Sequence, residues 1–233
     1  MLSFDLKPPF FEIGPKSYLY GDEVLELALS ADQASIKYDV DIIFTAPLLE
    51  IRRIVERTKR LHVFAPHMDP IHPGRGLAEV LPEAVRASGA TGVMLNHCEK
   101  PVTIDVLEKT ILRANEVGLA TIVCSNTLNQ AAAIAHLNPD IIVAEPNELI
   151  GTGQTSDIEY MTRTTGIIKA INNRIMVLQG AGISNGNDVY QVILNGADAT
   201  GSSSGIVKAP NRAAMIDEMI GAARRAWNQR NGK

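Results

Sequence analysis

Glu145 is a carboxylate at a position where α/β proteins keep their chemistry. It directly follows four apolar residues, 141–144, which are flanked by Pro139 and Pro146 and are typical of a short strand buried on both faces. In barrels and open α/β sheets, reacting groups lie just beyond the carboxyl ends of such strands. An ordinary strand-to-helix turn with a surface Glu has the same local sequence, so residues elsewhere in the chain must decide between the two.

Other expected strand ends carry groups that can react or bind anions. Lys16 follows the first strand and His97 the fourth, while glycine-rich turns at 180–182 and 201–205 follow the seventh and eighth. Small residues expose backbone N–H groups, and the turns after strands seven and eight of a barrel frequently hold a phosphate. Taken singly, these features also fit a solvated lysine, a turn histidine and tight turns. Their occurrence together and in this order favours one active site.

Strand-like and helix-like runs alternate along the chain and would position these groups. Apolar residues recur at helical spacing in 24–31, 48–59 and 107–117, and the last run is closed by Gly118 in the position of a helix C-cap. The third strand opens into a Pro/Gly-rich loop at 66–76. The expected strands are 9–13, 41–46, 61–65, 92–95, 119–124, 141–144, 175–179 and 197–200.

This alternation predicts a single domain, residues 1–233, folded as a closed (β/α)8 barrel. Parallel neighbours cannot be joined by hairpins, so a helix between successive strands indicates a parallel sheet. Eight such units in a chain of 233 residues fit a barrel. An open doubly wound sheet is the alternative. It usually carries a Gly-rich fingerprint after its first strand, and Gly14-Pro15-Lys16 is not one.

Composition limits the partners. The net charge of -4 and the pI of about 5.8 argue against nucleic acid or a membrane surface as the main partner. Cys98 and Cys124 are the only cysteines and border apolar runs, which indicates reduced thiols and a cytoplasmic location. No basic leader opens the chain, and no apolar run approaches the roughly 20 residues that a spanning helix needs. We therefore expect a soluble protein, with no cofactor and no metal.

The segments that carry these groups resemble triosephosphate isomerase, in particular its short archaeal type. The resemblance covers nearly the whole chain, and its most specific part is the Glu-Pro loop that ends in Ile-Gly-Thr-Gly. It implies a TIM barrel and an aldose–ketose isomerase that acts on a small phosphorylated sugar, either a triose phosphate or a related short ketose phosphate. The matching segments are 14–16, 96–99, 144–153, 180–183 and 201–208.

Carried over position by position, the resemblance implies a role for each residue. Glu145 would be the base, His97 the neutral electrophile and Lys16 the cation near the substrate oxygens. Moving a proton between the two carbons that flank a carbonyl requires these three functions. Loop 146–153 would be the lid that excludes water, a device for which this family is itself a standard example. The substrate and its phosphate would bind at Gly14, Gly151, Thr152, Gly180, Gly182, Gly201, Ser202 and Ser203.

The chain departs from the family pattern at several positions. Gly14 stands where the family has an Asn, which removes a hydrogen-bond partner of Lys16 and is expected to leave space beside the substrate. We therefore predict weak activity on triose phosphates and better activity on a longer or branched ketose phosphate. Residues 75–78 replace the Thr-Gly tip of the third loop, and Cys98 and Lys100 stand where the family has Ser and Arg. Glu99 is expected to be structural or to support its neighbours, and Cys124 to belong to the core.

Two other functions fit parts of this pattern. A phosphosugar-binding barrel without turnover, such as a sensor or regulator, would keep the phosphate-binding glycines. A barrel aldolase or lyase would use Lys16 as a Schiff-base nucleophile, but Glu145 and the lid would then have no clear role. Barrels of the resembled family complete their active site with a neighbour's third loop, so we expect a homodimer or a homotetramer.

Overall fold

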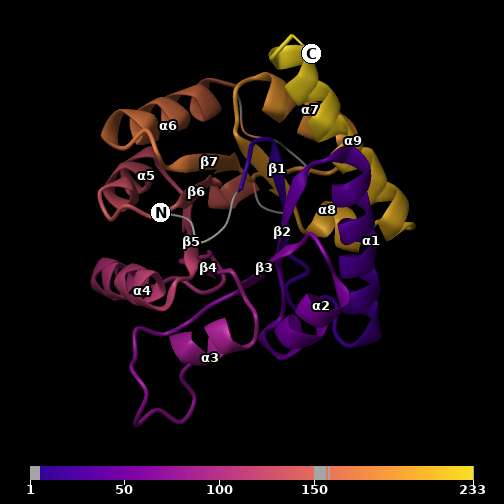
Figure 1. Ribbon diagram of the computed structural model, residues 1–233. Coiled ribbons are helices and arrows are strands. Elements are labelled where there is room, and N and C mark those ends of the chain that lie inside the picture. Colours follow the sequence, from indigo (N-terminus) through magenta and orange to yellow (C-terminus); the bar gives the residue numbers. More distant parts are fainter. Residues whose placement is uncertain (1–5, 150–155, 157, 233) are drawn as a thin grey trace.

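The computed structural model describes residues 6–149, 156 and 158–232, and in this part of the chain eight parallel strands close into one barrel (Figure 1). Each strand pairs with the next, and β1 pairs with β8 to complete the ring. The open-sheet alternative is therefore excluded. The strands are β1 (Phe10–Ile13), β2 (Asp41–Thr45), β3 (His62–Ala65), β4 (Gly92–Leu95), β5 (Ala120–Ser125), β6 (Ile141–Ala144), β7 (Met176–Gln179) and β8 (Ala199–Ser202).

Helices follow the strands and cover the outside of the barrel (Figure 1). Several begin at a side chain that accepts a backbone N–H, as Thr103 does before α4 and Asn211 before α9. Gly118 ends α4 in the left-handed region, with φ 75°, as expected for a C-cap glycine. The helices are α1 (Asp22–Tyr38), α2 (Ile51–Arg57), α3 (Pro82–Ala87), α4 (Ile104–Val117), α5 (Leu128–Ala135), α6 (Ile158–Ile171), α7 (Gly186–Leu194), α8 (Ser204–Val207) and α9 (Arg212–Arg230).

Several boundaries differ from the expected ones, most by one residue, and three differences affect the architecture. The run 48–59 divides into a 3₁₀ turn, Leu48–Glu50, which follows Pro47, and α2, which ends at Arg57. The third loop runs on beyond Gly76 to α3 and extends away from the barrel (Figure 1). The eighth strand lies two residues later than expected, because Gly201 and Ser202 pair with Glu12 and Ile13 of β1. Two residues that the sequence assigned to a phosphate-binding turn are therefore part of the barrel wall.

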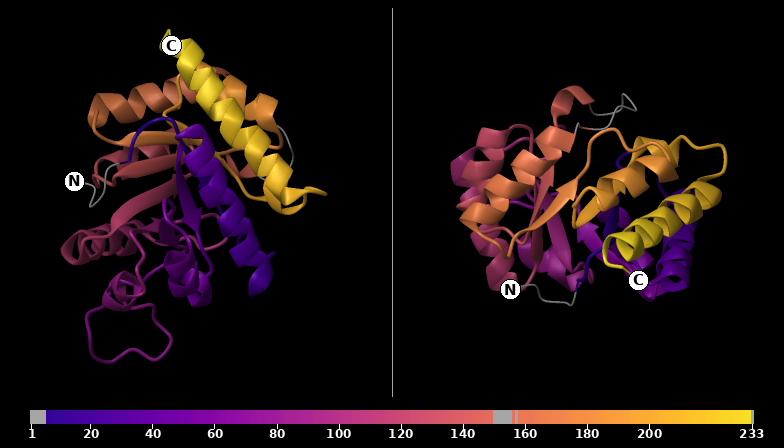
Figure 2. Two further views of the ribbon diagram at one scale, coloured as in Figure 1. Left: turned by 45° about the vertical axis from the view of Figure 1, so that its right-hand side comes forward. Right: turned by 90° about the horizontal axis from the view of Figure 1, so that it is seen from above.

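The barrel interior is filled by alternate side chains of the strands, which form an apolar cluster separate from the one beneath the helices. Phe64 is completely buried there, and its ring lies against Gly92 of the neighbouring strand. A Cβ atom on Gly92 would lie 2.3 Å from Phe64 Cζ, so only glycine fits at this position. Figure 2 shows the outer layer, where α9 lies between α1 and α7.

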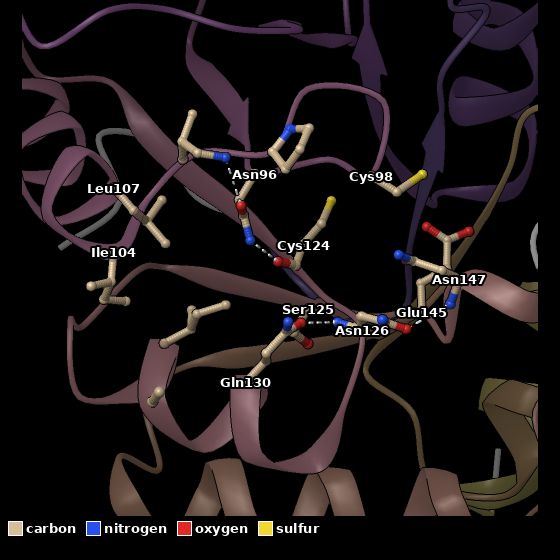
Figure 3. Close-up of a pocket in the computed structure, with 14 residues that line it drawn as sticks. Asn96, Cys98, Ile104, Leu107, Cys124, Ser125, Asn126, Gln130, Glu145 and Asn147 are labelled. Atoms are coloured by element: carbon tan, nitrogen blue, oxygen red, sulfur yellow. Dashed lines mark hydrogen bonds between the residues drawn. The ribbon is translucent and has the colours of Figure 1, made fainter.

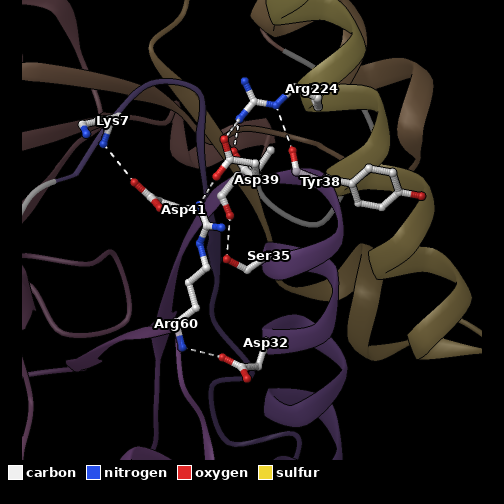
Figure 4. A network of polar contacts seen from close by, with 9 residues as sticks. Lys7, Asp32, Ser35, Tyr38, Asp39, Asp41, Arg60 and Arg224 are labelled. Atoms are coloured by element: carbon white, nitrogen blue, oxygen red, sulfur yellow. Dashed lines mark hydrogen bonds and ion pairs between the residues drawn. The ribbon is translucent and has the colours of Figure 1, made fainter.

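A polar network joins chain segments at the amino-terminal end of the barrel (Figure 4). The Arg60 guanidinium contacts the carboxylates of Asp39 and Asp41 at 2.5 and 3.3 Å. Arg224 of α9 donates through Nε to the Tyr38 carbonyl at 2.9 Å. The end of α1 is thereby tied to β2, to the turn before β3 and to α9. These bonds are at the amino-terminal face, where polar contacts contribute to stability. Active sites of such barrels lie at the opposite face, where the strands end.

Candidate active site

A cavity of about 790 Å³ opens at the carboxyl ends of the strands. Glu145, His97 and Lys16, which are far apart in the sequence, all line it. Parallel strands of a closed barrel place all their carboxyl ends at one mouth, which brings the three groups together. The cavity is also lined by Gly14, Gly180, Gly182, Gly201, Ser202 and Ser203. Gly151 and Thr152 lie outside the described residues, as does the lid from residue 150 onward.

Glu145 leaves β6 at the rim of the barrel. Its backbone N–H donates to the Ser125 carbonyl of β5 at 3.0 Å, which fixes where the side chain starts. Burial raises the pKa of the Glu145 carboxyl, while the Lys16 ammonium opposes this rise and Glu99 adds to it. A carboxylate with a raised pKa binds a proton more strongly than a surface glutamate. Glu145 is thus suited to accept a proton from a weak acid.

The geometry around His97 selects one tautomer. The backbone N–H of Glu99 donates to Nδ1 at 3.1 Å, so Nδ1 is the acceptor and the ring proton belongs on Nε2. Burial and the charge of Lys16 lower the pKa of His97, whereas Glu99 opposes this. The imidazole is therefore neutral near pH 7 and has one N–H to donate. Asn96 holds the loop, since its amide donates to the Cys124 carbonyl at 3.0 Å and accepts from Val102 N at 3.1 Å.

Lys16 is a cation held by an ion pair. Its Nζ lies 2.8 Å from Glu99 Oε1. Burial is the largest single influence on the pKa of Lys16 and lowers it, but the hydrogen bond and charge of Glu99, together with the charge of Glu145, outweigh burial, and the pKa is raised. The backbone of Lys16 has φ 50°, a region that non-glycine residues rarely occupy and that recurs at functional sites. Glu99, expected from sequence to be structural or supporting, thus contacts Lys16 with its side chain and His97 with its backbone.

The ends of β7 and β8 offer backbone donors. Within the described part of the chain, the N–H groups of Gly182 and Ser204 have no acceptor, and both residues line the cavity. Free N–H groups of this kind suit an anion. Ser203 Oγ is buried and also lacks a partner among the described residues. Ser202 differs, because its hydroxyl donates to the Ile183 carbonyl at 2.8 Å and so joins β8 to the turn after β7.

Glu12 is an ionisable residue of this cavity that sequence reasoning missed. It lies in β1, faces the barrel interior and lines the cavity. Thr45 Oγ1 donates to Glu12 Oε1 at 2.6 Å. Burial raises the pKa of Glu12 to about 7, although the Thr45 bond lowers it, and Glu145 raises it further while Lys16 lowers it. A carboxylate within an apolar strand run was the signal that could have found it.

The expected free space beside Gly14 is occupied in part. A Cβ atom on Gly14 would lie 2.9 Å from Glu12 Oε1. The missing side chain of Gly14 therefore makes room for the carboxyl of Glu12, two residues earlier in the chain. The expectation of an empty volume at this position was wrong, because side chains two apart in a strand point to the same face and here compete for one space.

A second, smaller cavity of about 370 Å³ lies between α4 and α5, with Glu145 on its wall (Figure 3). Cys98 and Cys124 line this second cavity, and Cys124 lines the first cavity as well. Burial raises the pKa of both thiols, that of Cys124 well above its usual range. Both are therefore protonated and unreactive near pH 7. Cys124 is buried in the barrel interior, which confirms its expected place in the core.

Two further properties of the described residues bear on function. Among residues 6–149, 156 and 158–232, there is no cluster of three or more His, Cys, Asp or Glu side chains that could hold a metal ion. No helix in the same residues is both long and apolar enough to cross a membrane.

Comparison with known proteins gives one consistent result. A family model described as triosephosphate isomerase matches residues 15–219. The triosephosphate isomerase of Methanocaldococcus jannaschii is 38% identical over 203 residues, which is 86% of this chain and 92% of that protein. The triosephosphate isomerase of Saccharolobus solfataricus is 33% identical over 226 residues, 95% of this chain and 99% of that protein. Lys16, His97 and Glu145 lie inside the range of the family model, whereas Glu12 and Gly14 precede it.

Proposed function

This chain belongs to the triosephosphate isomerase family, and from that membership we propose that Glu145, His97 and Lys16 interconvert the aldose and ketose forms of a small phosphorylated sugar. The chain is an aldose–ketose isomerase of the triosephosphate isomerase type. The family membership supports the reaction class, and the geometry of the cavity supports the role of each residue. The two alternative functions, a barrel without turnover and an aldolase, are not favoured.

The proposed reaction moves one proton between two carbon atoms. Glu145 removes a proton from the carbon beside the carbonyl, and the electron pair moves onto the carbonyl oxygen to form an enediolate. His97 donates its Nε2 hydrogen to that oxygen, and the charge of Lys16 stabilises the negative charge that develops there. Glu145 then returns the proton to the former carbonyl carbon, while His97 recovers its Nε2 hydrogen from the neighbouring hydroxyl, which becomes the new carbonyl. Atoms and charge balance without an external reactant.

One observation carries this proposal most strongly. The three groups share a cavity, and each has the protonation state that its role requires: a basic carboxylate, a neutral imidazole with its proton on Nε2, and a charged ammonium. An aldolase would need Lys16 as a neutral amine, yet the ion pair with Glu99 raises its pKa. The free N–H groups of Gly182 and Ser204 support a phosphate site at β7 and β8.

A Glu145→Gln variant tests the proposal. Gln keeps the size of the side chain but cannot accept the proton, so we expect kcat to fall by about 10²-fold or more while Kd for an unreactive sugar phosphate changes little. Glu108→Gln, on the exposed face of α4, is the matched control and should keep wild-type turnover. Isomerase activity retained by Glu145→Gln would contradict the role of Glu145. Binding of sugar phosphates without turnover by the wild type would favour the sensor.

For substrate and assembly, we propose a short ketose phosphate larger than a triose phosphate as the better substrate, and a cytoplasmic homodimer or homotetramer. The replacement of the family's Asn by Gly14 supports the first point, not through empty space but because it makes room for the carboxyl of Glu12, a polar group that lines the cavity. Exposed apolar side chains around the mouth of the barrel support the second, with Leu49 and Leu77 almost fully accessible.

A further inference from the structure

Glu12 is built into the cavity by three neighbouring strands. The Thr45 hydroxyl of β2 holds Oε1 at 2.6 Å. On the other side, Glu12 pairs with Gly201 of β8, where a Cβ atom would lie 3.1 Å from Oε2 and 3.0 Å from Glu12 Cβ. Gly14 leaves room for Oε1, since a Cβ atom added at this position would lie only 2.9 Å from it. Two glycines and one hydroxyl thus give this carboxyl a defined position.

In the part of the chain that the structure describes, the second oxygen of this carboxyl has no hydrogen-bond partner. Among the described residues, Oε2 accepts no hydrogen bond, and the side chain is accessible only from the cavity that it lines. Placing a carboxyl here is costly, because burial and Glu145 both disfavour its ionisation, as the pKa of about 7 records. The barrel gains no packing or pairing from Oε2 that would offset this cost. Glu12 Oε2 is thus an acceptor that is held in position, whose burial is unfavourable and which has no partner among the described residues. Groups with these properties are typical of ligand-binding sites.

The chemistry of the substrate indicates which group this acceptor would bind. A phosphate is excluded, because a carboxylate repels it. The three-carbon ketose phosphate has one carbonyl and one hydroxyl, and the proposed reaction uses both, with His97 and Lys16 at their oxygens. A fourth carbon adds a hydroxyl that the reaction does not use. That hydroxyl is a donor, and Glu12 Oε2 is an acceptor that faces the same cavity and has no partner among the described residues.

Resting on the proposed function, we propose that Glu12 is a specificity-determining residue whose Oε2 accepts a hydrogen bond from a substrate hydroxyl. The site then prefers ketose phosphates of at least four carbon atoms over the three-carbon ketose phosphate. Gly14 and Gly201 support this position, because a Cβ atom would crowd Glu12 at either place: at Oε1 beside Gly14, and at the backbone oxygen, Cβ and Oε2 beside Gly201. Glu145, His97 and Lys16 keep their roles.

The first experiment compares specificity ratios. The catalytic efficiency, kcat/KM, is measured for dihydroxyacetone phosphate, erythrulose 1-phosphate and erythrulose 4-phosphate with the wild type and with Glu12→Gln. A lost hydrogen bond to a charged group changes discrimination by about tenfold to hundredfold, so the ratio of the better four-carbon substrate to the three-carbon substrate should fall by that factor. Thr45→Val, which releases Oε1 without changing Glu12, should lower the same ratio by a smaller factor.

The second experiment is independent of turnover. In the Glu145→Gln background, Kd is measured for erythritol 4-phosphate, glycerol 3-phosphate and inorganic phosphate, with and without Glu12→Gln. We expect the preference for the four-carbon polyol to fall by about tenfold or more and the Kd of inorganic phosphate to stay within about twofold. A chain that isomerises no sugar phosphate would contradict the proposed function, while this binding preference would still test Glu12. Both ratios unchanged within twofold, in a folded Glu12→Gln variant, would overturn the role of Glu12 alone.

Discussion

At the scale of single residues, Glu12 couples the cavity to the stability of the barrel. Its pKa rises from 4.5 to about 7 on folding, so the folded protein holds a proton that the unfolded chain has lost between these values. The contribution of Glu12 to the unfolding free energy is therefore highest below pH 4.5, and it falls as the pH rises to 7. Glu145, Lys16 and Cys124 are the ionisable groups that interact with it.

We predict that Glu12→Gln raises the unfolding free energy, relative to the wild type, more at pH 8 than at pH 5. Gln has no ionisation to oppose, so the variant should gain on the order of 3 kcal/mol more in unfolding free energy at pH 8 than at pH 5, from a shift of this size. Urea denaturation of both proteins at the two pH values measures this difference. An effect that is the same at pH 5 and pH 8 would show that Glu12 is ionised in the folded protein throughout.

At the scale of strands and helices, two glycines illustrate how context decides their role. Gly92 of β4 lies under the ring of Phe64, and a Cβ atom there would overlap Cζ at 2.3 Å. Gly166 of α6 has open space around the same position. Both residues belong to regular elements, so local sequence does not distinguish them. The neighbouring strand makes one of them obligatory and leaves the other replaceable.

We predict opposite effects for the two alanine substitutions. Gly92→Ala should lower the unfolding free energy by about 1–3 kcal/mol or more, because Phe64 is enclosed and cannot move aside. Gly166→Ala should raise it by about 0.5–1 kcal/mol, because alanine favours the helix. Chemical denaturation gives both values. Adding Phe64→Leu should recover part of the loss of Gly92→Ala, and strict additivity of the two substitutions would argue against the overlap.

At the scale of the whole molecule, the loops around the mouth of the barrel expose several large apolar side chains to solvent. Tyr18, Leu48, Leu49 and Leu77 are 51%, 39%, 97% and 103% exposed, and Leu77 belongs to the long loop between β3 and α3 (Figure 1). Exposed apolar groups of this size are used in contacts between proteins. They come from the loops after β1, β2 and β3, so one face of the molecule carries them.

We predict that the 25.2 kDa chain sediments as a dimer or tetramer at micromolar concentration. Leu77→Glu should shift the equilibrium toward the monomer, because a charge would replace an apolar group in the contact. Ile36→Glu, at an exposed position of α1, is the matched control and should leave the assembly unchanged. A wild type that sediments only as a monomer would contradict the prediction.

The sequence alone determined the barrel and the place of its three reactive groups. Strands that are buried on both faces appear as continuous apolar runs, and their number and alternation with helices leave few topologies. The positions of Lys16, His97 and Glu145 after such runs then place them at one mouth. These are local signals, so they could be read without coordinates. The roles of the three residues stay predictions.

Only the tertiary structure decided how the wall of the cavity is filled. The sequence predicted an empty space beside Gly14, but Glu12 occupies it, held by Thr45 of β2 and accommodated by Gly201 of β8. Likewise, Ser202 was expected in a phosphate-binding turn, yet it lies in β8 and bonds to Ile183. Both outcomes depend on pairing between strands distant in the sequence. Which side chain fills a shared space is set by register across the closed barrel, and no local pattern records that register.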